Sequence, residues 1–168
     1  MAAHTLLFFT SEHATAENVV DRALTLNPNS AHAWMVRGLA SNLQNRPDRA
    51  VEAFEHAMSL SPLDPLGGRA FTFGLAAAHL AAGRYKQAIE WADRSLAAQP
   101  DYRPAMRLKV ICCAYLGRIN EAHDWLGRLL EIEPGFTIAG LKATMPQMSP
   151  ERFARYAEGL RKAGLPEE

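Results

Sequence analysis

Four prolines, each at the end of a helix-like apolar stretch, recur along the chain at nearly constant spacing. Pro28, Pro62, Pro100 and Pro134 close the segments LTLNP, MSLSP, LAAQP and LEIEP and stand 34, 38 and 34 residues apart. The longer middle interval contains a four-residue insertion, residues 65–68. Because proline cannot continue a helix, the same helix end recurs along the sequence. The chain is therefore expected to be an array of similar helical units, each packing on its neighbours.

Composition and spacing both favour pairs of closely packed helices. Alanine and leucine supply 29 and 20 of the 168 residues, and no segment alternates apolar and polar side chains as a strand does. An alanine stands twelve residues before each of the four prolines, at Ala16, Ala50, Ala88 and Ala122. A residue suited to a tight turn stands five residues before each of the last three alanines, at Asn45, Gly83 and Gly117.

The unit that begins at Ala31 carries the fullest pattern. Its marker residues are Trp34, Gly38, Ala50, Phe54, Ala57 and Pro62. Gly38 and Ala50 are small enough for two antiparallel helices to approach closely, and Trp34 and Phe54 would fill the space beside that contact. The chain therefore resembles the tetratricopeptide repeat (TPR) family. This resemblance implies an all-α fold, a right-handed superhelical α-α solenoid of TPR units with a C-terminal capping helix.

The repeat spacing predicts a single TPR domain over residues 1–168. Its expected parts are a partial unit at residues 1–30, complete units at residues 31–64, 69–102 and 103–136, and capping helices at residues 137–168. In the partial unit, the first helix is expected to be shortened to residues 4–9 and the second to span residues 14–26.

The capping segment is expected to contain a short helix over residues 136–143 and a longer one after Ser149. Ser149-Pro150-Glu151 is typical of a helix start, because serine caps the first N–H groups and proline suits the first turn. This helix would end at Gly164 and bury one apolar stripe, which consists of Phe153, Tyr156, Ala157 and Leu160.

From about residue 14 to the end, the chain also resembles the C-terminal repeat region of bacterial class III adenylate or guanylate cyclases, of the type abundant in rhizobia. The likeness is carried by DRALTLNPNSAHAW (21–34), FEHAMSLSPLDPL (54–66), LAAGRYKQAIEWADRSL (80–96) and YAEGLRKAGLPEE (156–168). The resemblance implies that an N-terminal domain carries the activity, using nucleoside triphosphate and two metal ions. No such domain stands in this sequence, so no residue here inherits a catalytic role. Similar arrays also follow DNA-binding domains in some bacterial transcription regulators.

No segment of the sequence carries residues typical of an active site. Phosphate-binding G-x-x-x-x-G-K and G-x-G-x-x-G loops, and the H-E-x-x-H and G-x-S-x-G motifs, do not occur. The six histidines are dispersed, with no pair four residues apart. Cys112 and Cys113 fit small packing groups better than a redox or metal site. The chain is therefore expected to be non-catalytic and to bind no cofactor or metal ion.

Charge and hydropathy narrow the class of partner. Eighteen basic and 18 acidic side chains balance to a formal net charge of zero, so nucleic-acid binding is not expected. The N-terminal run Leu6, Leu7, Phe8 and Phe9 is too short for a signal peptide. No run of about 20 apolar residues is present to span a membrane. A cytoplasmic protein with reduced cysteines is expected.

The TPR resemblance also implies where a partner would bind. In such arrays the first helix of each unit lines a concave groove through the residues one, four, eight and eleven positions after the unit start. Here these are His32, Met35, Leu39 and Asn42, then Ala70, Phe73, Ala77 and Leu80, then Pro104, Arg107, Ile111 and Ala114, with Tyr115 at the rim. The lining is mostly apolar and lacks the Lys, Asn and Arg clamp of arrays that hold C-terminal carboxylates. A helix or extended peptide of a partner protein is therefore predicted to bind there.

Two alternatives stand beside this prediction. The chain's own C-terminal helix could fill the groove. Leu6, Leu7, Phe8 and Phe9, with no preceding repeat to cover them, could form an apolar patch through which two copies associate. The leading hypothesis is thus a protein-interaction scaffold, as a regulatory part of a cyclase-type signalling protein, and the second is a homodimerisation module.

Overall fold

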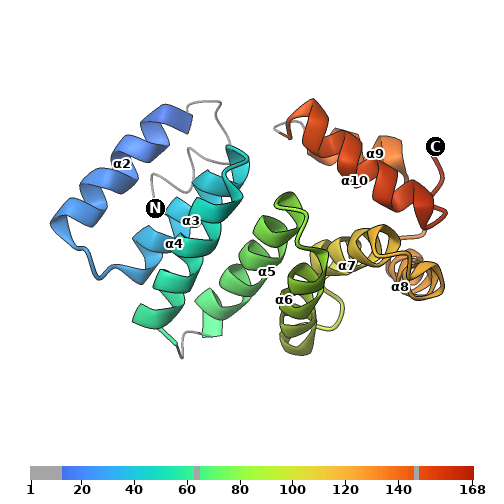
Figure 1. Cartoon of the computed structure of the whole chain (residues 1–168), viewed down its shortest axis with the longest axis horizontal. Helices are drawn as coiled ribbons and strands as arrows, with labels where there is room; N and C mark the ends of the chain where they lie inside the picture. Colours follow the sequence, from blue (N-terminus) through green and yellow to red (C-terminus); the bar gives the residue numbers. More distant parts are fainter. Residues whose placement is uncertain (1–12, 63–64, 146–147) are drawn as a thin grey trace. The chain divides into compact units, whose positions relative to one another are not determined.

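The computed structural model describes residues 13–62, 65–145 and 148–168, and these residues fold into nine α-helices and no strand (Figure 1). The all-α class expected from the sequence is confirmed over this part of the chain. The chain divides into two compact units, Met1–Ala82 and Gly83–Glu168. None of the described helices is long and apolar enough to cross a membrane.

The first unit contains the described helices α2 (His13–Leu26), α3 (Ala31–Leu43), α4 (Pro47–Leu60) and α5 (Pro65–Ala81). α3 and α4 form a helical hairpin, α2 packs on α3, and α5 packs on both α4 and α3. α2 agrees closely with the helix predicted over residues 14–26. The shortened helix predicted over residues 4–9 lies outside the described residues.

α5 begins earlier than the repeat spacing predicts. The second complete unit was expected to start at Arg69, yet α5 starts at Pro65 and is 17 residues long. The insertion is thus helical and adds about one turn at the N-terminus of the helix. Proline at the first helical position accounts for this, because its fixed φ suits the first turn and its missing N–H has no helical partner there.

Phe54 of α4 is the centre of packing in the first unit. Its side chain is fully buried, and its ring lies against two glycines, Gly38 on α3 and Gly74 on α5. A Cβ atom added at Gly38 would lie 2.8 Å from the ring, and one added at Gly74 would lie closer still. Both helices can therefore approach the ring only because these residues lack a side chain. Ala50 and Ala57, on the same side of α4, are fully buried as the repeat pattern predicts.

Trp34 connects the proline turn before α3 to helix α4. Its indole Nε1–H donates a hydrogen bond of 2.7 Å to the carbonyl oxygen of Pro28. Its ring meets the ring of His56 edge-on, with centroids 4.4 Å apart and an interplanar angle of 63°. The tryptophan and the preceding proline of the repeat pattern are therefore in direct contact.

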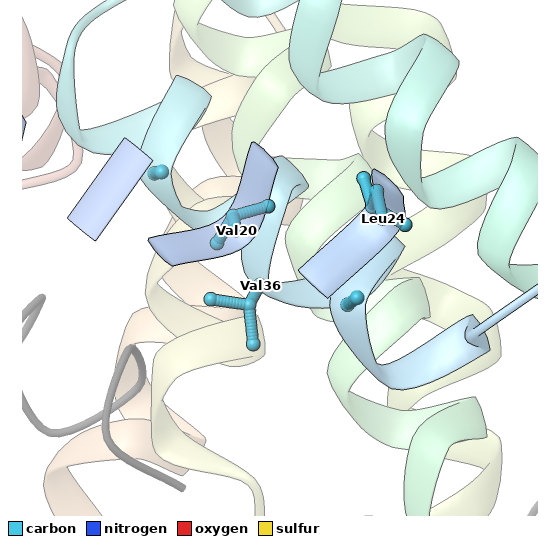
Figure 2. Packing of buried hydrophobic residues seen from close by; sticks show 5 residues of the cluster. Val20, Leu24 and Val36 are labelled. Carbon is cyan, nitrogen blue, oxygen red and sulfur yellow. The ribbon is translucent and has the colours of Figure 1, made fainter. Parts of the chain in front are cut away.

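A second apolar cluster joins α2 to α3 (Figure 2). Val20 and Leu24 of α2 pack with Val36 of α3. Ala33 and Ala40 complete the buried set, and their small side chains allow the two helices to lie close together. The second helix of the partial unit is thus packed on the first complete unit, as expected for neighbouring repeats.

The turns that follow α3, α5 and α7 use left-handed backbone. Asn45, Gly83 and Gly117 have φ values of 56°, 73° and 73°. Glycine and asparagine adopt this conformation more readily than other residues do. The turn positions predicted from the repeat spacing are therefore confirmed.

The second unit contains α6 (Tyr85–Ala98), α7 (Arg103–Tyr115), α8 (Ile119–Ile132), α9 (Ile138–Thr144) and α10 (Pro150–Lys162). α7 packs on α6 and on α8. α10, the red helix in Figure 1, packs on α7 and also touches α9.

α10 begins and ends where the sequence predicts. The Ser149 hydroxyl accepts a hydrogen bond from the backbone N–H of Arg152 at 3.4 Å, and Pro150 opens the helix. Gly164, which follows the helix, has a φ of 86°. Tyr156, Ala157 and Leu160 of the predicted apolar stripe are buried, whereas Phe153 is half-buried.

The tail after α10 turns back to the start of α9. The backbone N–H groups of Ile138 and Ala139 donate to the carbonyl oxygens of Pro166 and Glu167, each at 3.0 Å. The first N–H groups of a helix have no partner within the helix, so these two bonds satisfy donors that would otherwise face water. The tail is therefore part of the packed unit.

We expect Gly74→Ala to lower the free energy of unfolding by about 1–3 kcal/mol, because the added methyl group would overlap the buried Phe54 ring. The matched control is Gly127→Ala on α8, where an added Cβ meets no atom within 4 Å. That change should leave stability unaltered or raise it by up to about 1 kcal/mol through helix propensity. Urea unfolding followed by circular dichroism measures both variants, and equal effects at the two positions would contradict this account of the Phe54 contact.

Candidate functional site

The first helices of two successive units lie side by side in the first compact unit. α3 packs directly against α5. The buried side-chain amide of Asn42 fixes this contact, since its Nδ2–H donates to the carbonyl oxygen of Gly74 at 3.0 Å. α3 and α5 are therefore neighbours, as the groove prediction requires of them. We use the name α3–α5 face for four predicted groove residues of these helices: His32, Met35, Leu39 and Phe73. Met35 and Leu39 also pack against the cluster that joins α2 to α3.

The predicted groove residues of the first unit divide by burial. His32 is exposed, and Met35, Leu39 and Phe73 are half-buried. Ala70 is half-buried as well. Asn42, Ala77 and Leu80 are buried, with exposed fractions of 8%, 8% and 0%. The side chains of these three belong to internal packing, so a partner would meet the four residues of the α3–α5 face and Ala70.

In the second unit, α10 packs on α7 and covers one of the predicted groove residues, Ile111. Ile111 is fully buried, and a Cβ atom added at Gly159 of α10 would lie 2.7 Å from its Cγ2 atom. Ala114 is also buried, with 4% of its surface exposed. Ile111 was predicted as an anchor for a partner, but the structure fills this position with the chain's own C-terminal helix. At Ile111, the arrangement matches the alternative in which the chain's own C-terminal helix lies against the groove residues.

Tyr115 fastens α10 to the end of α7. Its hydroxyl lies 2.8 Å from the carbonyl oxygen of Arg155, to which it can donate, and 3.1 Å from a carboxylate oxygen of Glu158. Its ring stacks on Tyr85 with centroids 4.8 Å apart, and the Lys162 ammonium lies 4.7 Å from the ring centroid. Burial, together with the Glu158 carboxylate, raises the pKa of Tyr115 to about 12.

Arg107, also predicted to line the groove, is engaged within the unit. Its guanidinium lies 3.0 Å from the Glu133 carboxylate, and Arg103 approaches the same carboxylate at 3.7 Å. The guanidinium also lies 4.6 Å from the centroid of the Phe136 ring. Only 13% of the Arg107 side chain is exposed. Its guanidinium therefore binds α7 to the segment that follows α8 and is not displayed to a partner.

A small cavity of about 350 Å³ opens between α2, α3 and α4. Its lining residues are Glu17, Val20, Asp21, Trp34, Arg37, Ala40, Ser41, Arg49, Glu52 and Ala53. Charges of both signs line it, and Arg37 pairs with Asp21 within the lining. Glu17, another lining residue, pairs with Arg46, which lies outside the lining. The repeat pattern did not predict this cavity, because it depends on the spacing between helices of adjacent units.

Cys112 and Cys113 are packing groups in the core of α7. Both side chains are fully buried, and neither forms a disulfide. Burial raises the pKa of the Cys112 thiol well above its usual range. Burial and the nearby Glu121 carboxylate raise the pKa of Cys113 to about 12. Within the described ranges, no three His, Cys, Asp or Glu side chains gather as a metal site would require.

Comparison with family models identifies the class of protein. Tetratricopeptide repeat models match residues 41–110, 79–145 and 5–65. The chain belongs to the tetratricopeptide repeat family, whose members are generally non-catalytic. No curated protein is similar to the chain in sequence.

Solved structures share the fold at low sequence identity. The MamA structure is 18% identical in sequence and has a TM-score of 0.65, and the match covers 84% of this chain and 72% of the MamA chain. PilW, a widely conserved type IV pilus biogenesis factor, is 23% identical and has a TM-score of 0.65, and the match covers 96% of this chain and 73% of the PilW chain. YrrB, a TPR protein with an unusual peptide-binding site, is 21% identical and has a TM-score of 0.66, and the match covers 96% of this chain and 80% of the YrrB chain. These similarities establish the TPR fold for this chain.

We expect neither Cys112 nor Cys113 to react with iodoacetamide in the folded protein at pH 8. The thiolate is the reactive form, and burial of both side chains disfavours it. Mass spectrometry should show no added mass before unfolding and two alkylated cysteines after unfolding in urea. Rapid labelling of the folded chain would mean that α7 opens readily and that the thiols are not packing groups.

Proposed function

We propose that this chain is a non-catalytic protein-interaction module that binds a helix or extended peptide of a partner protein on the α3–α5 face. The observation that carries the proposal is the side-by-side packing of α3 and α5, with Met35, Leu39 and Phe73 only half-buried. Membership of the TPR family supports it. The peptide-binding site of the structurally similar YrrB is consistent with it.

The chemistry of the α3–α5 face favours an apolar ligand. Its defining side chains are an imidazole, a thioether, an isobutyl group and an aromatic ring, and none carries a fixed charge. Methionine adapts its shape to different apolar partners, and aromatic residues commonly supply much of the binding energy of an interface. We therefore expect the partner to contribute a short row of apolar side chains.

Site-specific photocrosslinking tests this proposal. A benzophenone amino acid at the exposed position His32 should capture a partner from the source cell extract, whereas the same group at exposed Glu55 on α4 should not. Adding Met35→Glu to the His32 probe should lower the crosslink yield at least tenfold, because a carboxylate would face the apolar ligand. Circular dichroism checks that this variant still folds. Equal capture from His32 and Glu55, or a yield unaffected by Met35→Glu, would contradict the assignment.

A second candidate function is self-association through α2. Val19 and Leu26 are seven residues apart on this helix, and 36% and 80% of their surfaces are exposed. Residues at this spacing lie on the same side of a helix, so they present an apolar strip that the described helices leave uncovered. The patch predicted from Leu6, Leu7, Phe8 and Phe9 lies outside the described residues and remains a prediction.

Light scattering across a range of concentrations tests self-association. If α2 is the interface, the chain should dimerise, and Leu26→Ser should raise the dimer dissociation constant at least tenfold. Ile132→Ser on α8 is the matched control, because Ile132 is also exposed, at 45%, and also ends its helix. A monomer at every concentration, or equal effects of the two substitutions, would exclude α2 as a dimer interface.

The resemblance of four segments to the repeat region of bacterial class III cyclases supports a regulatory setting for this module. In that setting, the α3–α5 face would bind a segment of a cyclase or of a protein that controls it. The arrangement of neighbouring genes provides a direct check. A cyclase domain encoded in frame or in the same operon would support the setting, and a neighbourhood without one would count against it.

A further inference from the structure

α10 occupies the face of α7 as a ligand helix would. The groove position Ile111 is fully buried and lies against Gly159 of α10, and Tyr115 contacts α10 at the rim. Tyr156 and Leu160, one turn or less from Gly159 on the same helix, are buried as well. An amphipathic helix whose apolar side lies in a groove is a recurring mode of peptide recognition.

Glycine at position 159 makes this close contact possible. A Cβ atom there would lie 2.7 Å from Ile111 Cγ2 and 3.1 Å from Tyr115 Cε2. Even alanine would therefore force the two helices to shift. We call the surface of α7 formed by Ile111 and Tyr115 the α7 face. A helix can approach it this closely only if it carries glycine at the point of contact.

Polar contacts set the orientation of α10. The Tyr115 hydroxyl is within hydrogen-bonding distance of the Arg155 carbonyl and the Glu158 carboxylate. Lys162 pairs with Glu158 at 2.8 Å and places its ammonium over the Tyr115 ring. These groups lie at the exposed edge of the contact, where exchange with water is easy, so they direct the helix more than they hold it.

We propose that the α7 face is a second docking site whose occupant in this structure is the chain's own α10, and that an amphipathic helix of a partner protein replaces it. The partner helix would resemble α10, with an aromatic residue, a glycine three positions later and a leucine directly after the glycine. A carboxylate directly before the glycine would meet the Tyr115 hydroxyl. The inference rests on the proposed interaction function but concerns a different face, so the two can fail separately.

Competition between the two helices has a measurable consequence. A partner can bind the α7 face only in molecules from which α10 has moved away, so its apparent affinity is reduced by the fraction of such molecules. Weakening the attachment of α10 within the chain should therefore tighten the binding of a helix added from outside.

The experiment uses the full chain and a fluorescent peptide of residues 149–168 as the added helix. Gly159→Val in the chain should unseat α10 through overlap with Ile111, and the labelled peptide should then bind at least tenfold more tightly than it binds the unaltered chain. A peptide that itself carries Gly159→Val should not bind either protein. Ala154→Val is the matched control, because Ala154 lies on the exposed side of α10, and this variant should bind the peptide no better than the unaltered chain.

Amide hydrogen exchange shows whether α10 has moved. Faster exchange confined to residues 150–162 of the Gly159→Val chain, together with tighter peptide binding, supports the proposal. A mobile α10 without peptide binding would overturn it, and so would an α10 that stays protected. Dimerisation of the variant would also overturn it, because a second copy would then cover the face.

Leu160→Ala in the chain provides a second route if Gly159→Val does not fold. It removes most of a fully buried side chain from α10 and leaves α7 unaltered. The labelled peptide keeps its own Leu160, so its binding should tighten at least tenfold, because truncating a buried leucine weakens packing strongly. Unchanged peptide binding would contradict the proposal. In either variant, capture by the His32 photocrosslinker should equal that of the unaltered chain, because the substitutions lie outside the α3–α5 face. A missing crosslink in the unaltered chain would therefore count against the proposed function and not against the α7 docking site.

Discussion

The burial of one aromatic ring between two glycines determines the arrangement of the first unit. Phe54 is fully buried, with Gly38 of α3 on one side and Gly74 of α5 on another. Because neither glycine has a side chain, α3 and α5 both come within reach of the same ring and pack against each other. The hydrogen bond from Asn42 to the Gly74 carbonyl then fixes their register. The α3–α5 face therefore exists because Phe54 brings the two helices together.

The second unit uses glycine in the same way but for a different partner. Gly159 lets α10 lie against Ile111 at a distance that no other residue would permit. In the first unit the close approach leaves a partly apolar face exposed, whereas in the second it covers the corresponding positions of α7. In this chain, the first helix of a unit is therefore either left partly exposed, as α3 and α5 are, or covered by a later helix of the same chain, as α7 is.

The sequence predicts the repeat well because the repeat is encoded locally. Asn45, Gly83 and Gly117 mark turns through their own backbone preferences, and Ser149 marks a helix start through its own hydroxyl. The sequence offered the covering of the groove by the C-terminal helix only as an alternative, because the contact of Ile111 is made with Gly159, 48 residues further along the chain. Gly159 was missed because glycine inside a helix pattern signals only lower helix propensity. The structure shows its role, which is to let α10 approach Ile111 closely.

The hydrogen bonds between the tail and α9 have a consequence for the order of folding during synthesis. α9 leaves the ribosome before α10 does, yet two N–H groups at its start are satisfied by the carbonyl oxygens of Pro166 and Glu167. Domains generally fold from the N-terminus as the chain emerges. The first unit can therefore close early, while the bonds that complete the first turn of α9 form only after residue 167 has been added. Between these two moments, Ile111 of α7 has been made but the helix that covers it has not.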